Sequence, residues 1–208
     1  MFSSITILLV AVSVIASVAA FTDARLYQQL LFEPFVIRAR GQWYRFVTHA
    51  LIHANWPHLL VNMFVLYMFG RNVEALYGMI TGRSAVLPFI LLYLGGVVFS
   101  SLPSYRKHID DPSYRAVGAS GAVSAVLFAQ VLMLPTREVA LLFLPIPMPA
   151  WVFGGLYLLY SWYMDERGGD NVAHDAHFYG ALFGILFTAA LDPQLILDPG
   201  SLQRALGI

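Results

Sequence analysis

The chain has 208 residues, of which 59% are hydrophobic and 12% charged, and its formal net charge is zero. Soluble domains carry about 25% charged residues, so this composition predicts an integral membrane protein. The balanced charge gives no basis for nucleic-acid binding, and the absence of cysteine excludes disulfides, thiolate catalysis and cysteine metal sites.

The first apolar segment, residues 3–21, has the length of a spanning helix but also the position of a signal peptide. No basic residue precedes it, and it exceeds the roughly 7–15 apolar residues of a signal-peptide core. A run of about 20 apolar residues matches the thickness of a bilayer. We therefore expect a first transmembrane helix that is retained.

Five further apolar segments follow, and lipid forces each to satisfy its own backbone hydrogen bonds as an α-helix. The six expected spans are residues 3–21, 57–77, 84–102, 118–134, 147–164 and 175–191. They predict an all-α membrane bundle of six helices, forming a single domain over residues 1–208. The alternating prolines of "PIPMP" (145–149) exclude a continuous helix there, so residues 139–146 are expected to be extended or interfacial. The long loop 23–45 mixes aromatic residues with arginines, which predicts a structured interfacial loop.

Polar side chains inside the expected spans are the candidates for function, because they are costly in lipid. The second span holds His58 and Asn62, which are four residues apart and share a helix face. The fourth span holds Ser120 near its start. The sixth span holds His177, with His174 three residues earlier on the same face.

Ser120 and His177 are expected at the same depth in the membrane. Their spans run in the same direction, since each alternates with a span that runs the other way. Ser120 lies as far before Pro135, which ends the fourth span, as His177 lies before Asp192, which ends the sixth. At about 1.5 Å per residue both lie roughly 22 Å from that end, or roughly 8 Å below the opposite surface of a bilayer core about 30 Å thick. Measured from Arg71 on the second span, His58 lies at a similar level, about 20 Å up, and Asn62 lies about one turn deeper.

Small residues allow the fourth and sixth spans to approach closely. The fourth span has three pairs of small residues one turn apart, and the sixth span has one. These pairs are Gly118 and Ala122, Ser120 and Ser124, and Gly121 and Ala125 on the fourth span, and Gly180 and Gly184 on the sixth. Small residues at this spacing let helix backbones come together in a membrane. Close approach is what a serine and a histidine on different helices need to form a hydrogen bond.

This combination of residues predicts nucleophilic catalysis. A serine hydroxyl is a poor nucleophile until a neighbouring base takes its proton, and Ser120 with His177 supplies that pair. The attacked carbonyl becomes an oxyanion, for which His58, Asn62 and the Ser120 backbone N–H are the available donors. The flanking Gly118 and Gly121 have no side chains, so that a peptide can reach the Ser120 hydroxyl.

Four stretches together make the sequence resemble the rhomboid family of intramembrane serine proteases. They are "HANWPHLLVN" (53–62), "GRNVEALYG" (70–78), "GASG" (118–121) and "AHFYGALFG" (176–184), in that order. The first carries a His-x-x-x-Asn pair, the second a Gly-x-x-x-Glu-x-x-x-Gly element with Glu74, and the last two surround Ser120 and His177. The resemblance covers about residues 40–190.

The resemblance implies a six-helix rhomboid bundle, a Ser-His dyad without a third acidic residue, and cleavage of transmembrane segments. It makes Ser120 the nucleophile and His177 the general base, and it assigns His58, Asn62 and the Ser120 amide to the oxyanion hole. The implied partners are transmembrane protein substrates and the lipid bilayer, with no cofactor and no metal ion. Residues 165–175 become a capping loop, and the fifth span becomes a lateral gate. Neither the sequence nor the resemblance indicates an oligomeric state.

Two positions depart from the family pattern. The Trp-Arg pair that many members have in the first loop is "YR" at 44–45 here. Some members have a tyrosine one turn after the serine, stacked on the catalytic histidine, and Ser124 occupies that position here. Another side chain must therefore hold His177, and His174 and Tyr179 are the candidates.

The family orientation places the N-terminus in the cytoplasm and opens the serine to the non-cytoplasmic side, which we expect to be that of a bacterial inner membrane. The charges oppose this orientation, because the cytoplasmic side would hold four of the 12 basic residues, namely Arg71, Arg83, Arg137 and Arg204. The positive-inside rule favours the reverse. Several outside arginines lie in loop 23–45, where folded structure can account for them, so we keep the family orientation.

Other interpretations predict different behaviour. A non-catalytic rhomboid-like binder of membrane helices would typically lack the serine or the histidine, and both are present. A metal or proton transporter would use the histidines independently of Ser120. His49 and His53 are four residues apart, but no His-Glu-x-x-His motif accompanies them, so we expect them to make loop contacts. A metal pair of His174 and His177 would have only Asp175 as a further ligand.

Overall fold

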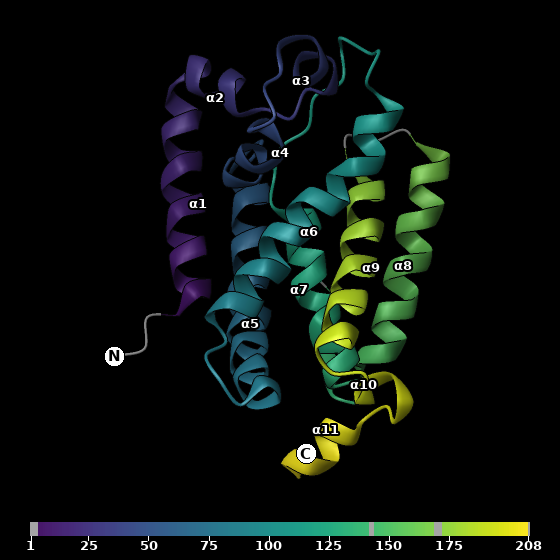
Figure 1. The fold of residues 1–208 in the computed structure, drawn as a ribbon. Helices are drawn as coiled ribbons and strands as arrows, with labels where there is room; N and C mark the ends of the chain where they lie inside the picture. The colour runs from purple at the N-terminus through teal and green to yellow at the C-terminus, as the bar shows by residue number, and fades with distance from the viewer. Residues whose placement is uncertain (1–3, 142–143, 169–171, 208) are drawn as a thin grey trace.

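The structure is a computed structural model that describes residues 4–141, 144–168 and 172–207. Each of the six segments expected to span the membrane forms a helix. These helices are α1 (Ile5–Thr22), α5 (Trp56–Thr81), α6 (Val86–Lys107), α7 (Ser120–Met133), α8 (Ala150–Arg167) and α9 (His174–Leu191). They stand side by side, with α1 at one edge, α8 at the other and α7 in the middle (Figure 1).

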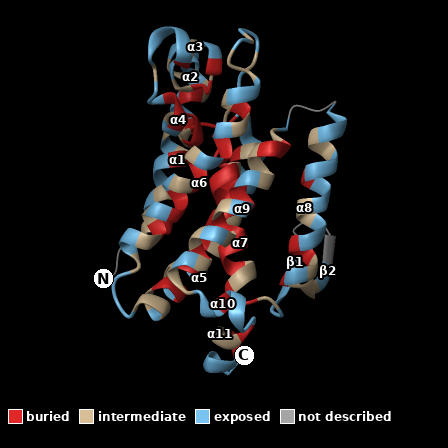
Figure 2. Cartoon of the chain, turned by 45° about the vertical axis from the view of Figure 1, so that its right-hand side comes forward, coloured by how far each residue is buried: buried red, intermediate tan, exposed pale blue. Residues whose placement is uncertain are grey.

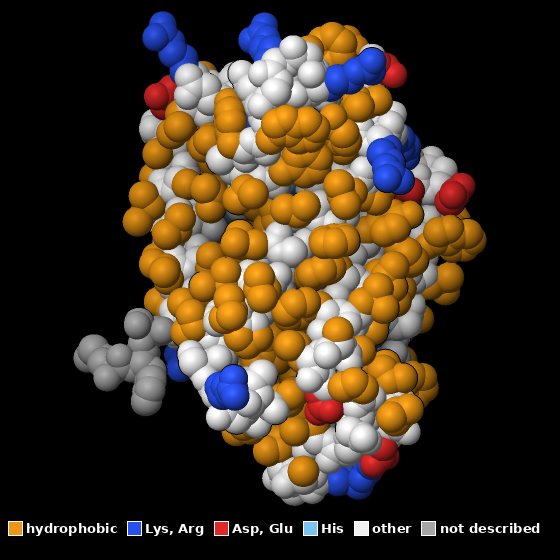
Figure 3. All heavy atoms as spheres, viewed as in Figure 1, with side chains coloured by type: hydrophobic (Ala, Val, Ile, Leu, Met, Phe, Trp, Pro, Cys, Tyr) orange, Lys and Arg blue, Asp and Glu red, His pale blue; other side chains and the backbone are white. Residues whose placement is uncertain are grey.

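Three of these helices, α1, α5 and α6, are long and apolar enough to cross a membrane by length and composition. Helix α7 is apolar but has only 14 residues. Helix α8 ends in charged residues and α9 begins with histidine and aspartate, which lowers their hydropathy. Crossing by all six helices therefore remains a prediction. Hydrophobic side chains cover the middle of the face seen in Figure 3, and most charged side chains lie toward its ends.

The connections contain shorter elements. The first loop holds α2 (Ala24–Leu30), α3 (Pro34–Arg40), α4 (Arg45–Thr48) and the 3₁₀ turn η1 (His49–Leu51); a hairpin of β1 (Glu138–Leu141) and β2 (Leu144–Pro149) precedes α8; α10 (Gln194–Leu197) and α11 (Ser201–Leu206) follow α9. In the hairpin, Glu138 pairs with Pro149 and Val139 with Met148 in antiparallel register. The extended structure expected around "PIPMP" is thus present, and the fold is mostly helical rather than all-α.

Helix α6 continues for a further turn beyond its expected end at residue 102. The helix passes through Pro103 and ends at Lys107. Polar groups in this extra turn find tertiary partners, because the Ser104 hydroxyl donates to Asp175 and Lys107 Nζ lies 3.8 Å from an Asp165 oxygen. These contacts come from segments that are distant in the sequence. The position of Pro103 alone therefore could not predict that the helix continues past it.

Helices α7 and α9 form the tightest contact of the bundle. A Cβ atom added at Gly180 would overlap the Gly121 carbonyl oxygen, and one added at Gly184 would overlap the Ala125 carbonyl oxygen. The two contacts advance by one turn on both helices together, so α7 and α9 run parallel. This is the close approach that the small residues predicted, and α7 is the most completely buried helix (Figure 2).

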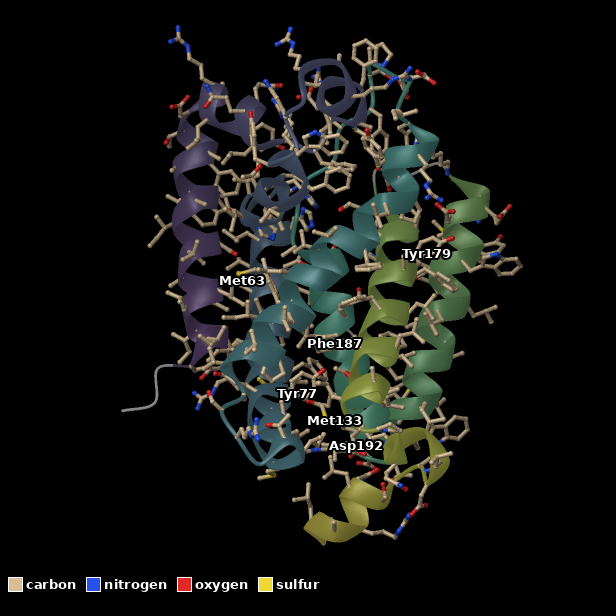
Figure 4. All side chains as sticks on the ribbon, in the orientation of Figure 1. Met63, Tyr77, Met133, Tyr179, Phe187 and Asp192 are labelled. Carbon is tan, nitrogen blue, oxygen red and sulfur yellow. The ribbon has the colours of Figure 1, made fainter. Side chains whose placement is uncertain are left out.

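The lower part of the core joins α5 and α9. Tyr77 and Phe187 lie close together there, 6.4 Å between ring centroids, with Met133 of α7 in the same region (Figure 4). The buried Tyr77 hydroxyl and Thr188 Oγ1 are 2.7 Å apart and satisfy each other. A buried hydroxyl needs such a partner in a membrane bundle, because lipid offers none.

Glu74 ties α5 to the start of α1. Its carboxylate accepts hydrogen bonds from the Ser4 hydroxyl at 2.7 Å, the Ile5 backbone N–H at 2.8 Å and the Thr6 hydroxyl at 2.9 Å. An acceptor at this place satisfies the unpaired N–H groups of a helix N-terminus and complements its dipole. Gly70 lies one turn earlier, where an added Cβ would be 2.8 Å from Thr6 Cγ2. The Gly-x-x-x-Glu element is therefore the docking site of α1.

The first loop is folded around a buried arginine. Arg45 is 5% exposed, and its guanidinium donates to the carbonyl oxygens of Gln28 and Leu31 at 2.9 and 2.6 Å. Glu33 lies 3.0 Å from the same guanidinium and 3.2 Å from that of Arg115. A buried cation with this many partners holds α2, α3 and the segment before α7 together. The loop is structured, as its composition predicted.

Candidate active site

Ser120 is the first residue of α7, and the segment 108–119, which links α6 to α7, runs past the first loop to reach it (Figure 1). Backbone hydrogen bonds guide this descent. Phe32 and Ala116 exchange two hydrogen bonds of 3.0 Å, and the Gly118 N–H donates to the His49 carbonyl at 3.0 Å. With 14 residues, α7 is about 21 Å long, shorter than a bilayer core of about 30 Å. Its start therefore lies below the level of the first loop.

His53 connects the turn before Ser120 to α1. Its Nε2 accepts the Ala119 N–H at 3.5 Å, and its Nδ1 lies 3.0 Å from the Ser17 hydroxyl. Because Nε2 is the acceptor, the ring proton is on Nδ1 and donates to Ser17. The Ser17 hydroxyl in turn donates to the Leu51 carbonyl at 3.1 Å. The neutral ring thus links α1, the first loop and the residue before Ser120.

The buried loop histidines are held neutral. Burial lowers the pKa of His49 to about 4, against a smaller opposing effect of its hydrogen bond to the Arg45 carbonyl. Burial, with a smaller contribution from neighbouring His58, lowers the pKa of His53 to about 3. In the unfolded chain both histidines titrate near 6.5. The unfolded state therefore binds more protons than the folded state once the pH falls below about 6.5.

We expect the free energy of unfolding to be highest above neutral pH and to fall as the pH drops from about 6.5 toward 4. The expected loss at pH 5 is about 2 kcal/mol for each of the two histidines. Denaturant unfolding in detergent at pH 7.5 and pH 5 measures it. His53→Gln is expected to lower stability at both pH values but to reduce the difference between them. A difference as large as that of the wild-type chain would contradict this assignment.

His58 lies directly over the backbone of Gly118. A Cβ added at Gly118 would be 2.6 Å from His58 Cε1 and 2.8 Å from its Nε2, and Gly118 has a φ of +114°. Both the space and the backbone conformation require glycine here. His58 Nδ1 accepts the Ala54 N–H at 3.5 Å, which assigns the ring proton to Nε2. That N–H is on the side of the ring that faces the turn before Ser120.

Asn62 lies one turn deeper on α5 and is 6% exposed. Its Nδ2 donates one hydrogen bond to the His58 carbonyl at 2.9 Å. The side-chain amide has two N–H groups, so this bond fixes the amide and leaves a second donor.

The start of α7 supplies further donors. Its N-cap residue, Ala119, makes no side-chain capping bond. The first N–H groups of a helix have no partner within the helix, and they attract negative charge. Gly121 packs against α6, where an added Cβ would overlap Ser100 Oγ, and against α9, where it would be 3.3 Å from the Ala176 carbonyl. The segment therefore tolerates no side chain at this position.

His177 lies in the first turn of α9. Because Gly180 opposes Gly121 on parallel helices, the Cα atoms of His177 and Ser120 differ in axial position by only about 3 Å. This is close to the equal depth expected from the sequence. The imidazole stacks against the ring of Tyr157, with centroids 6.2 Å apart and planes 30° from parallel, and His174 approaches it edge-on at 5.8 Å.

Tyr157 of α8 is the site residue that the sequence reasoning missed. The aromatic run 155–163 is typical of a membrane interface, so the sequence alone does not single out one of its tyrosines. A tyrosine inside an apolar helix needs a partner for its hydroxyl, and Ser124 stands where an aromatic ring was expected; together they were the available signal. Of the two expected candidates, His174 contacts the His177 ring, whereas Tyr179 is 42% exposed and its ring packs on Phe178 (Figure 4).

The segment expected to cap the site, residues 165–175, is only partly loop. Helix α8 includes residues 165–167, and α9 begins at His174. Residues 169–171 lie outside the described part of the chain. Asp175 anchors the start of α9 to α6 through Ser104, and its Oδ1 accepts the Ala176 N–H at 2.7 Å.

A small polar cavity lies beside Ser120. Its volume is about 30 Å³, and its polar lining includes His49, Ser100, Ser101 and Ser104. His49 Nε2 lies 3.3 Å from the Ser101 hydroxyl, while its Nδ1 donates to the Arg45 carbonyl at 2.9 Å. A polar cavity of this size is large enough for one water molecule.

The histidine pairs that were considered as metal ligands contact other protein groups. His49 and His53 bond to separate partners on α6, α1 and the loop, as expected for loop contacts. Among the described residues, no group of three or more histidine, cysteine or acidic side chains is arranged to hold a metal ion.

The sequence of this chain matches a known protein family. The family model described as "Rhomboid domain" matches residues 40–194. The chain is 27% identical over 181 residues to RHOMBOID-like protein 12, mitochondrial, of Arabidopsis thaliana, covering 81% of this chain and 54% of that protein. It is 32% identical over 173 residues to Rhomboid-like protein 11, chloroplastic, of the same plant, covering 75% and 56%. It is 35% identical over 91 residues to Rhomboid protease GluP of Bacillus subtilis, covering 44% and 16%.

These relatives are longer proteins, because the chain spans about half the length of the first two and less of the third. Two of them have organellar names, so they do not support the bacterial inner membrane expected from the sequence. The apolar helices and the matched domain together establish an integral membrane protein.

Proposed function

Because this chain belongs to the rhomboid family, we propose that it is an intramembrane serine endopeptidase that uses Ser120 and His177 as a catalytic dyad. The observation that carries the proposal is the backbone contact between Gly121 and Gly180. It aligns the starts of α7 and α9 in parallel, so that the serine and the histidine lie within about one helical turn along the axis. A relative named as a rhomboid protease supports the same activity.

In the first half of the reaction, Ser120 Oγ attacks the carbonyl carbon of the scissile peptide bond while His177 takes its proton. The negative charge that develops on the carbonyl oxygen is stabilised by three donors: His58 Nε2–H, Asn62 Nδ2–H and the Ser120 backbone N–H. When the tetrahedral intermediate collapses, the C–N bond breaks and His177 returns its proton to the leaving amine. The acyl group remains as an ester on Ser120.

In the second half, water attacks the ester carbon, and His177 again acts as the base. The same donors stabilise the second oxyanion, and its collapse releases the new carboxyl terminus and restores the serine hydroxyl with the proton from His177. Water must therefore reach a residue below the surface of the bilayer. The polar cavity beside Ser120 supports this supply route.

The proposed substrates are transmembrane segments of other membrane proteins. A peptide in an intact helix has its carbonyls hydrogen-bonded, so the segment must unwind before Ser120 can attack it. Small or helix-destabilising residues are therefore expected at the cleavage site. The proposed face of opening is the non-cytoplasmic one, on the side of loop 23–45 and the starts of α5, α7 and α9.

Covalent labelling tests the nucleophile directly. We expect a fluorophosphonate probe to label the detergent-solubilised protein and the adduct mass to map to the peptide that contains Ser120. Ser120→Ala is expected to abolish labelling, because it removes the attacking oxygen. Ser161→Ala, which removes a buried hydroxyl on α8, is the matched control and should label like the wild-type chain. Labelling that survives Ser120→Ala would reject the assignment, and absence of labelling in the wild-type chain would favour a non-catalytic binder.

A further inference from the structure

Tyr157 lies where α7, α8 and α9 meet. Its hydroxyl is 2.6 Å from the Ser124 hydroxyl on α7, and its ring stacks against the His177 imidazole on α9 at 6.2 Å between centroids. Phe128 and Phe153 approach the same ring at 5.4 and 5.9 Å, so the tyrosine is packed on its other sides as well. One side chain of α8 thus contacts both helices that bear the dyad.

The arrangement ties the base to the helix of the nucleophile. Ser124 is one turn after Ser120 and shares its face of α7. The Tyr157 hydroxyl is fixed to Ser124, and the ring face of Tyr157 lies against His177. Tyr157 therefore fixes the position of the imidazole relative to α7, although the imidazole itself belongs to α9. An imidazole in a dyad without an acidic third residue needs such a constraint, because proton transfer requires one ring orientation.

We propose that Tyr157 is the positioning residue of the general base, and that Ser124 acts in this role by holding the tyrosine hydroxyl. The proposal rests on the proposed function, since it assigns a part within the same site. Tyr157 touches neither the substrate nor the reacting atoms in this role and acts through His177 alone.

The proposal makes the dyad sensitive to the placement of α8. Apart from Tyr157, much of α8 faces outward: Trp151, Leu156, Leu159, Tyr160, Trp162 and Tyr163 are each more than half exposed. Its four buried residues are Ala150, Phe153, Gly154 and Ser161. A displacement of α8 away from both α7 and α9 would break the bond to Ser124 and withdraw the ring from His177. The orientation of the base is therefore coupled to the position of α8.

Kinetics on a transmembrane substrate in detergent tests the proposal. Tyr157→Phe and Ser124→Ala each remove the same hydrogen bond, and we expect each to lower kcat by about threefold to tenfold with KM within about twofold. Tyr157→Leu also removes the ring and is expected to lower kcat by about 30- to 100-fold. The Ser124→Ala/Tyr157→Phe double variant should be no slower than the slower single variant, because both changes break one contact. Tyr163→Phe removes an exposed hydroxyl from the same helix and is the matched control.

Three kinetic results would overturn the proposal: an unchanged kcat in Tyr157→Leu, a raised KM with unchanged kcat, or multiplicative losses in the double variant. A raised KM would mean that the tyrosine binds substrate. If Tyr157→Leu does not fold, the two hydroxyl-deleting variants and their double variant decide. Fluorophosphonate labelling of Ser120 in the wild-type chain separates this question from the proposed function: labelling that is lost in Ser120→Ala but unaffected in the Tyr157 variants sinks the positioning role alone.

Discussion

Replacing His177 by alanine is expected to lower the rate of peptide cleavage by about a thousandfold or more. Without the imidazole, Ser120 keeps its proton and the leaving amine receives none. The substitution removes a half-buried side chain and leaves the glycine contacts between α7 and α9 in place, so folding should be retained. Cleavage of a transmembrane substrate in liposomes, with denaturant unfolding measured alongside, checks both expectations.

His174→Ala is the matched control for that experiment. It removes an imidazole from the same face of α9, one that contacts the His177 ring from the edge. We expect a far smaller loss than for His177→Ala, because His174 is given no part in proton transfer. Equal losses in the two variants would contradict the choice of His177 as the base.

Gly180→Ala is the substitution outside the dyad with the largest expected effect. The added methyl group would overlap the Gly121 carbonyl oxygen, so α7 and α9 must move apart. Overpacking of this kind costs about 1–3 kcal/mol of stability, and a displacement of about 1 Å between reacting groups costs about a hundredfold in rate. We expect both losses together, measured as denaturant unfolding and as substrate cleavage.

Gly155→Ala provides the comparison, because a Cβ at Gly155 of α8 would meet no atom within 4 Å. It should leave stability and activity near those of the wild-type chain. Wild-type activity in Gly180→Ala would show that the separation between α7 and α9 does not set the geometry of the dyad.

Local sequence predicted the positions of the helices because they depend on short-range rules. Six apolar runs became six helices, and the paired Gly180 and Gly184 produced the close contact of α9 with α7. The depth estimate for Ser120 and His177 depended only on the rise per residue and on where each helix ends. These quantities are properties of single helices, which is why a sequence alone supports them.

Such short-range rules could not predict the contacts between segments that are distant in the sequence. The extension of α6 through Pro103 depends on the bond from Ser104 to Asp175, which is 71 positions away in the chain. The hydrogen bond from Ala119 to His53 joins the segment before α7 to the end of the first loop, 66 positions away in the chain. Tyr157 fills the space beside His177 because α8 packs against α7 and α9, and no spacing within α8 encodes that neighbour.

The most direct measurement of the central claim is a kinetic cycle on the dyad itself. Cleavage of one transmembrane substrate in liposomes would be compared for the wild-type chain, Ser120→Ala, His177→Ala and the double variant. If the hydroxyl and the imidazole act as one unit, the double variant will be no slower than either single variant. Losses that multiply, or cleavage that persists without Ser120, would show that the two residues do not form a catalytic pair.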